Sequence, residues 1–373
     1  MFEAIILAGL VLLNYSQALP TSPTVQQIQA SRSDQGHLID RRAEDSSIPL
    51  ERDESAGIFT ANMVIEGILL PMHVDTGSSQ LWGAHESCQA CRDAHMIVLD
   101  TVLPEECERK DIQYAAGTVT GCLANTSVSL GSYYVEDLRI LLATDISEEI
   151  AMHGHLYSGT LGLADDKLTI GNTSTFGSSL FTQGQIPSPK IGFYLPGRNN
   201  PVDEGKMAFG NSIERFTTNI EPITLPRARP DDGVYVINVT KVSVGETTVA
   251  SNQQAVLDTG SLGIGIPPSM SDNILSTIYG KITEEDGGKK VNGSSPLGEN
   301  NLTSLSFTFD GKTFNVGYEE LISTSQEDGQ CWALMDTYKG NEADETWILG
   351  EAFLHTVYHV INIEDGTVDL HNA

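Results

Sequence analysis

A short motif occurs twice in the chain and constrains its fold more than any other feature. Both copies are short runs of four residues that directly follow an apolar stretch: Asp75-Thr76-Gly77-Ser78 and Asp258-Thr259-Gly260-Ser261. A single Asp-Thr-Gly also suits an ordinary turn. Two copies with matching flanks instead predict two equivalent loops, each holding a carboxylate at the end of a strand with its oxygens pointing outward.

A second repeat follows each motif at a similar distance. Residues 159–164 read Gly-Thr-Leu-Gly-Leu-Ala, and residues 347–353 read Trp-Ile-Leu-Gly-Glu-Ala-Phe. Both segments place apolar-compatible residues before a glycine. The repeats predict two pseudo-symmetric lobes that each contribute one carboxylate to a shared cleft.

Alternation of apolar and polar residues predicts that the chain is mostly β. The segments with strand or hairpin patterns are 57–70, 112–121, 134–142, 190–195, 234–244, 305–316 and 357–363. Helix and strand patterns do not alternate along the chain. The pattern therefore favours an all-β fold with two β-rich lobes over an α/β fold.

A few segments differ from this β pattern. Short helices are expected at 178–183 and 274–279, and the polar, Gly-rich residues 282–303 are expected to form a surface loop. A proline-rich run at 222–230 marks the junction between an N-terminal lobe, 43–221, and a C-terminal lobe, 222–373.

The charge of the chain is strongly acidic. It carries 21 Lys and Arg against 50 Asp and Glu, a net charge of −29 at pH 7. Because no basic patch is available to neutralise phosphates, nucleic acid and anionic membranes are excluded as partners. Partial protonation would relieve the repulsion among the carboxylates, so the composition suits acidic surroundings, although an ordinary acidic secreted protein has the same balance.

The N-terminal residues have the features of targeting and processing segments. Residues 4–13 are apolar and precede the small-x-small pattern Ser16-Gln17-Ala18, which predicts a signal peptide over 1–18 that is too short to anchor in a bilayer. Residues 19–42 are polar and end in Arg41-Arg42. We expect a zymogen whose propeptide, 19–42, is removed by a kexin-like processing enzyme; an uncut surface Arg pair is the alternative.

Other features fit a secretory route. Sequons for N-glycosylation occur at Asn125, Asn172, Asn238, Asn292 and Asn301, although sequons also arise by chance. Neither a transmembrane helix nor a GPI signal is recognised. We expect a secreted, extracellular, monomeric protein, with an acidic vacuole as the alternative location.

The chain has five cysteines, an odd number. In an oxidising compartment four would pair and one would stay outside the disulfides. Cys107 and Cys122 flank the hairpin at 112–121 and could tie its base together. A zinc or redox role for Cys88-Gln89-Ala90-Cys91 would need a second matching pair, which the sequence lacks.

The two Asp motifs, the Tyr-containing hairpin between them and the block at 347–353 together resemble the pepsin family of single-chain aspartic endopeptidases. The resemblance covers about residues 44–373. It implies a bilobal fold in which Asp75 and Asp258 share one proton and activate a water, without metal or cofactor. It also implies a disulfide between Cys88 and Cys91.

The resemblance assigns supporting roles to the residues around each Asp. Thr76 and Thr259 are expected to brace the two loops across the lobe interface. Ser78 and Ser261 are expected to bond the outer carboxylate oxygens, and Gly77 and Gly260 complete the turns. Two positions depart from the family pattern, since Ser158 and Glu351 stand where relatives usually have Asp.

The hairpin at 112–121 matches the mobile flap that closes over substrate in the family. Tyr114 is then the flap tyrosine, with Trp82 as its hydrogen-bonding neighbour, and Ala116 and Gly117 face the substrate. Relatives usually have Gly and then a hydroxyl or acidic residue after this Tyr, whereas Ala115 and Ala116 stand here. We expect weaker substrate holding and a shifted flap equilibrium.

His73 lies on the same face of the strand as Asp75, because side chains alternate with period two. At the border of the substrate pocket, a cationic His73 would favour a substrate with an acidic or polar side chain there. The alternative is a histidine that packs against the strand and has no selective role.

These features predict a secreted aspartic endopeptidase that cleaves peptide or protein substrates at acidic pH. Two other classes compete with this prediction. One is a catalytically silent relative that binds peptides or proteins in the same cleft, and the other is a two-carboxylate glycosidase.

Overall fold

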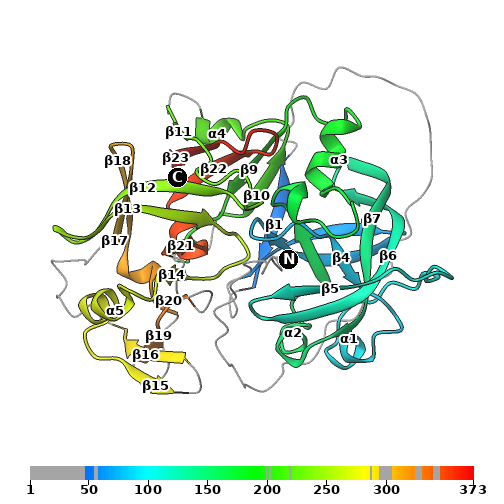
Figure 1. The fold of residues 1–373 in the computed structure, drawn as a ribbon, viewed down its shortest axis with the longest axis horizontal. Coiled ribbons are helices and arrows are strands. Elements are labelled where there is room, and N and C mark those ends of the chain that lie inside the picture. The colour runs from blue at the N-terminus through cyan, green and yellow to red at the C-terminus, as the bar shows by residue number, and fades with distance from the viewer. Residues whose placement is uncertain are drawn as a thin grey trace.

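The computed structural model describes residues 47–53, 58–198, 200, 203–217, 221–285, 288–293, 305–323, 330–338 and 345–373. The signal peptide and propeptide predicted at 1–42 lie outside the described residues, as does the sequon Asn301. Figure 1 shows two β-rich bodies, the N-terminal half at the right and the C-terminal half at the left. The predicted all-β, two-lobed architecture is confirmed.

The described part of the N-terminal half contains ten strands and several short helices. The strands are β1 (Ile48–Arg52), β2 (Phe59–Ile65), β3 (Ile68–Asp75), β4 (Trp82–Ala84), β5 (Arg109–Tyr114), β6 (Gly117–Leu130), β7 (Tyr133–Ile146), β8 (Gly159–Gly162), β9 (Lys190–Tyr194) and β10 (Gly205–Phe209). The helices are α1 (Gln89–Asp93), α2 (Glu148–Ala151), the 3₁₀-helix η1 (Asp166–Leu168), α3 (Phe176–Thr182) and α4 (Glu214–Thr217).

The C-terminal half contains the remaining elements. Its strands are β11 (Ile223–Leu225), β12 (Val236–Val244), β13 (Thr247–Leu257), β14 (Ile264–Ile266), β15 (Thr283–Glu285), β16 (Gly288–Asn292), β17 (Leu305–Phe309), β18 (Lys312–Val316), β19 (Gln330–Trp332), β20 (Met335–Thr337), β21 (Thr346–Leu349), β22 (Val357–Asn362) and β23 (Val368–Asn372). Its helices are α5 (Ser271–Tyr279), the 3₁₀-helix η2 (Tyr318–Glu320) and α6 (Glu351–Leu354).

The two halves repeat one arrangement of strands. In the first half the order β3-β8-β4-β7 has parallel, antiparallel and parallel pairings. In the second half β13-β21-β14-β20 has the same three pairings in the same order. The strand that ends at each Asp-Thr-Gly loop therefore lies beside the strand of the second sequence repeat in both halves.

A sheet built from both halves joins them. Its strand order is β11-β23-β22-β9-β10-β1, and β1 also pairs with β2 of the N-terminal half. The central pairing joins β9 and β22. It runs from the pair Lys190–Asn362 at one end to the pair Tyr194–Tyr358 at the other. Figure 1 shows these strands between the two bodies.

Most of the elements expected from the sequence are present. The hairpin at 57–70 is β2–β3, and its turn uses Glu66 and Gly67 with φ of 49° and 82°. The hairpin at 305–316 is β17–β18 and turns at Asp310 and Gly311, with φ of 43° and 89°. Left-handed backbone at both central residues is the geometry that the twist of a tight hairpin requires.

The prediction of a surface loop over 282–303 is wrong for those residues of the range that the structure describes. Strands β15, Thr283–Glu285, and β16, Gly288–Asn292, pair antiparallel, and β19 extends them to a three-stranded sheet. Val291 is buried opposite Cys331, and Lys289 binds Asp336 at 2.7 Å. β16 has a single buried apolar residue, so the segment lacks the alternation that identifies a strand. One of its two partner strands, β19, also comes from a distant part of the chain.

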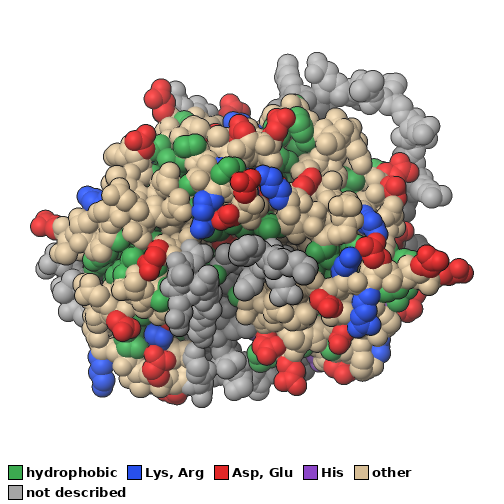
Figure 2. Space-filling model, viewed as in Figure 1, with side chains coloured by type: hydrophobic (Ala, Val, Ile, Leu, Met, Phe, Trp, Pro, Cys, Tyr) green, Lys and Arg blue, Asp and Glu red, His purple; other side chains and the backbone are tan. Residues whose placement is uncertain are grey.

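The surface carries the acidic character of the sequence. Figure 2 shows Asp and Glu side chains over both halves of the face it draws, with fewer Lys and Arg between them. Among the described residues, none of the helices combines the length and apolar character needed to cross a membrane.

Candidate active site

The first Asp-Thr-Gly loop holds the Asp75 side chain at the end of β3. Gly77 N–H donates to Asp75 Oδ1 at 2.8 Å, and the Ser78 hydroxyl donates to Oδ2. The backbone is fixed by β8, because Leu163 N–H donates to the Asp75 carbonyl at 2.8 Å. Asp75 is buried, with 1% of its surface exposed. Both carboxylate oxygens therefore have a fixed direction.

The second loop repeats these bonds around Asp258. Gly260 N–H donates to Asp258 Oδ1 at 2.9 Å, and the Ser261 hydroxyl donates to Oδ2 at 2.6 Å. The equivalence arises because the local sequence and the neighbouring strands are the same in both halves.

The two threonines tie one loop to the other. Thr76 N–H donates to Thr259 Oγ1 and Thr259 N–H donates to Thr76 Oγ1, both at 3.0 Å. Each hydroxyl then donates across the interface, from Thr76 to the Leu257 carbonyl at 3.0 Å and from Thr259 to the Val74 carbonyl at 2.9 Å. These four bonds fix the distance between the two strand ends.

The two carboxylates face each other at this interface. A Cβ atom added to Gly77 would lie 2.6 Å from Asp258 Oδ1, and one added to Gly260 would lie 2.4 Å from Asp75 Oδ1. Only glycine lets each loop approach the opposite carboxylate this closely. Burial raises the pKa of Asp258 well above its usual range, and the neighbouring charge of Asp75 raises it further, against the bonds from Ser261 and Gly260.

A small cavity of about 20 Å³ lies next to Asp75 under the flap hairpin β5–β6. Four of the five predicted substrate-binding residues line it, namely His73, Trp82, Tyr114 and Ala116. Three further lining residues were not predicted from the sequence: Ile150, Tyr157 and Thr160. Thr160 could have been found from the repeat segment 159–164, to which it belongs; in the structure it pairs with His73 in the parallel β3–β8 ladder.

Gly117 lies apart from this cavity. It forms the closing pair of the flap with Tyr114 and has a φ of 142°. A Cβ here would lie 2.1 Å from Ser147 Oγ at the start of α2. Gly117 therefore allows the flap to pack closely against the start of α2.

Tyr114 and Trp82, the predicted hydrogen-bonding neighbours, lie together in the wall of the cavity. Tyr114 Oη and Trp82 Nε1 are both buried, and neither forms a hydrogen bond of strict geometry with a described residue. Burial raises the pKa of Tyr114, and the charge of Asp75 adds to this effect. Ser78 and Trp82 lie near enough to the Tyr114 hydroxyl to lower its pKa by hydrogen bonding. Burial outweighs these contacts, so the tyrosine hydroxyl is a neutral group in the flap, beside Ser78 and Trp82.

His73 is buried and stacks on Tyr157, with ring centroids 5.3 Å apart. Burial lowers its pKa, the charge of Asp75 opposes this, and His153 lowers the pKa further. His73 therefore holds a proton less readily than a free imidazole. This environment favours a neutral ring in the cavity wall over the cation considered from the sequence.

The disulfides agree with the sequence predictions. Cys88 pairs with Cys91, and Cys107 pairs with Cys122 at the base of the flap hairpin. Cys331 is buried in β19, outside both disulfides.

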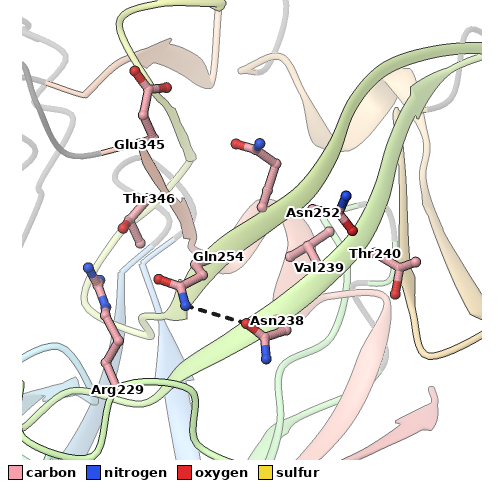
Figure 3. Close-up of a pocket in the computed structure, with 9 residues that line it drawn as sticks. Arg229, Asn238, Val239, Thr240, Asn252, Gln254, Glu345 and Thr346 are labelled. Atoms are coloured by element: carbon pink, nitrogen blue, oxygen red, sulfur yellow. Dashed lines mark hydrogen bonds between the residues drawn. The ribbon is translucent and has the colours of Figure 1, made fainter.

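A second hollow, of about 600 Å³, lies on the C-terminal half, over β12 and β13 (Figure 3). Gln254 donates to Asn238 Oδ1 at 3.4 Å across these strands. Most of its lining is polar: Arg229, Asn238, Thr240, Asn252, Gln253, Gln254, Glu345 and Thr346. It contains neither carboxylate of the Asp-Thr-Gly loops, and it holds the sequon residue Asn238.

The described residues include no group of three or more His, Cys, Asp or Glu side chains placed to hold a metal ion. At the interface the structure places two buried carboxylates, each held by a serine hydroxyl and a backbone amide.

Comparison with known proteins gives the same family as the motifs. A family model described as eukaryotic aspartyl protease matches residues 69–373. Rhizopuspepsin-1 of Rhizopus niveus is 28% identical over 304 residues, covering 80% of this chain and 74% of that protein. The probable vacuolar protease A of Trichophyton verrucosum (strain HKI 0517) is 26% identical over 313 residues, with the same two coverages. The chain therefore belongs to the eukaryotic aspartyl proteases, the pepsin-like family that its motifs resemble.

Proposed function

We propose that this protein is an aspartic endopeptidase in which Asp75 and Asp258 form the catalytic pair. One observation carries the proposal: the two carboxylates face each other where Thr76 and Thr259 join the loops, and both are held by the same pattern of hydrogen bonds. Because two carboxylates this close cannot both ionise at low cost, they share one proton. Burial and the charge of Asp75 raise the pKa of Asp258, which favours the retention of one proton within the pair.

The shared proton allows peptide hydrolysis without a covalent intermediate. The ionised carboxylate takes a proton from a water molecule as the water oxygen bonds to the scissile carbonyl carbon, while the protonated carboxyl gives its proton to the carbonyl oxygen. The product is a neutral gem-diol. Proton transfer to the amide nitrogen and cleavage of the C–N bond then release an amine and a carboxylic acid. The serine and glycine bonds keep the carboxylates in position throughout.

Digestion of a denatured protein at about pH 3 to 5, where a shared-proton pair is active, tests the proposal. Cleavage should be blocked by a peptide inhibitor that carries a tetrahedral hydroxyl, and it should be lost in Asp75→Asn and in Asp258→Asn. Binding of peptide without any cleavage would instead support a catalytically silent relative, and release of sugar would support a glycosidase.

We also propose that the protein is made as a zymogen on the secretory route. Two disulfides support an oxidising compartment, and the exposed Asn238 supports N-glycosylation. Processing after Arg42 would give a mature chain that begins at Ala43, about five residues before β1. Terminal sequencing of the secreted protein tests this, since a product that retains residues 19–42 would contradict it. Mass change on deglycosylation, compared between wild type and Asn238→Gln, tests the glycan.

A further inference from the structure

Five ionisable side chains meet where the two halves join. We call them the junction cluster: Arg52, Arg198, Glu320, Glu351 and His355. Arg52 ends β1 and Arg198 follows β9, so both come from the N-terminal half. The two acids and the histidine come from η2 and α6 of the C-terminal half. The proposed mechanism uses none of them.

Contacts within the cluster cross between the halves. His355 Nδ1 lies 2.6 Å from Glu320 Oε2, and Arg198 N–H donates to Glu320 Oε1 at 3.2 Å. The Phe59 ring contacts both Arg52 and His355. Its centroid lies 5.6 Å from the Arg52 guanidinium carbon and 6.2 Å from the centroid of the His355 ring. Burial raises the pKa of Glu320, but the bond from His355 and the charges of His355 and Arg198 outweigh it and lower the pKa.

Glu351 has fewer close partners than Glu320, although the Phe59 backbone N–H forms a hydrogen bond to its carboxyl and lowers its pKa. It is 1% exposed, and its Oε2 accepts no hydrogen bond from any described residue. The nearest cationic candidate, His355 Nε2, is 3.9 Å away. Burial raises the pKa of Glu351 to about 8, against the charges of Arg198 and Arg52, which lower it. A buried carboxyl with so few donors therefore favours its neutral form up to about pH 8.

The backbone of Glu351 supports the Asp258 loop. Its N–H donates to the Ser261 carbonyl at 2.7 Å, and the Ser261 hydroxyl donates to Asp258 Oδ2 at 2.6 Å. The equivalent position of the N-terminal half is Leu163, between the repeat glycine and alanine. An apolar residue therefore suits this place in the loop. The carboxyl of Glu351 must serve another purpose.

We propose that Glu351 is a positioning residue whose neutral form holds α6 against the Asp258 loop, so that the junction cluster limits the active arrangement to acidic and neutral pH. When Glu351 ionises, a charge is buried between the halves that Arg52, Arg198 and the Phe59 N–H do not fully offset, and α6 and Ser261 lose their fixed position. The catalytic consequence rests on the proposed peptidase function. The effect on unfolding does not.

The sign of the effect follows from the protonation states. Between the ordinary pKa of a glutamate, near 4.5, and the value of about 8 in the folded protein, only the folded state keeps the proton. The free energy of unfolding therefore falls as pH rises through this window and levels off above it.

The test is urea unfolding followed by tryptophan fluorescence between about pH 4 and pH 9, a range that spans both pKa values. Glu351→Gln is neutral at every pH and has nearly the same shape. It should unfold like wild type at the acidic end and lose much less stability as pH rises. Glu364→Gln, which changes an exposed carboxylate, should keep the wild-type dependence. If Glu351→Gln does not fold, Glu351→Leu, with the residue of position 163, answers the same question.

Activity measured at acidic pH after incubation at about pH 9 gives a second readout, because the ionised form of Glu351 outnumbers the neutral form about tenfold one unit above its pKa of about 8. The Glu351→Gln variant should then retain up to about tenfold more activity than wild type. Equal pH dependence of unfolding in wild type and in both Glu351 variants would overturn the proposal, whether or not the protein cleaves peptides. Altered unfolding together with a complete absence of proteolysis would overturn only the peptidase function.

Discussion

Thr76 and Thr259 each accept a hydrogen bond from the backbone N–H of the other, at 3.0 Å in both directions. The hydroxyls also donate to carbonyls of the opposite strand ends. The loops that carry the two carboxylates are therefore parts of one hydrogen-bonded unit. A substitution that displaces one loop should also displace the other.

Thr76→Val should show this coupling. Valine has nearly the same shape but leaves the buried Thr259 N–H without an acceptor, which costs about 1 to 3 kcal/mol of unfolding free energy. Thr76→Ser keeps the hydroxyl and should lose much less. Urea denaturation of the three proteins provides the comparison. Equal midpoints for valine and serine would mean that the bonds across the interface do not stabilise the protein.

Gly260→Ala should impair catalysis more than folding. The added methyl would lie 2.4 Å from Asp75 Oδ1 and would push the carboxylates apart. Misplacement of catalytic groups by about 1 Å can cost about a hundredfold in kcat. Gly184→Ala is the control, because that glycine has a φ of 67° and no atom within 4 Å of its added Cβ. The control should lose stability through backbone strain and keep its kcat.

His73→Ile should change which side chain fits the cavity beside Asp75. The substitution keeps the size of the wall and removes its polar ring, so preference should move by about tenfold toward apolar side chains. Cleavage of a peptide library by both proteins measures this. Ile150→Val changes the size of the same wall without changing its polarity. An unaltered preference in His73→Ile would leave His73 with a packing role alone.

The rate should depend on pH through the shared proton. Because the pKa of Asp258 is raised by burial and by Asp75, the one-proton state of the pair persists above the usual range of a free carboxyl. kcat/KM should therefore stay high in acid and fall with a single ionisation as pH rises and that proton is lost. A rate that increases toward alkaline pH would contradict the assignment.

Loss of the Cys107–Cys122 disulfide should destabilise the base of the flap. The bond closes a loop with a sequence separation of 15, for which the entropy model gives about 3 kcal/mol. Replacing both residues with serine should lower the urea midpoint more than the same change at Cys88 and Cys91, whose separation is 3. Similar losses in the two double variants would show that loop closure is not the cause.

The parts of the fold that depend on local sequence were predictable. Each Asp-Thr-Gly loop is held by bonds to residues two and three places away, so the repeat alone locates both carboxylates. The hairpins at Gly67 and Gly311 follow from alternation and turn residues in the same way.

The parts of the fold that depend on contacts between distant residues could not be predicted from the sequence. The pairing of β9 with β22 brings together positions near 192 and 360 that share no motif. Tyr157 lines the cavity because β8 lies beside β3, and the junction cluster gathers residues from four separate segments. No period or spacing in the sequence relates Arg52 to Glu351.

The strand pairing between β9 and β22 has a practical consequence for dissecting the molecule. Cutting the chain near residue 221 would not release two independent pieces, because each would expose a bare strand edge with unmatched backbone donors and acceptors. Fragments expressed separately should aggregate or reassemble with each other, and the pair of acids can exist only in the reassembled form.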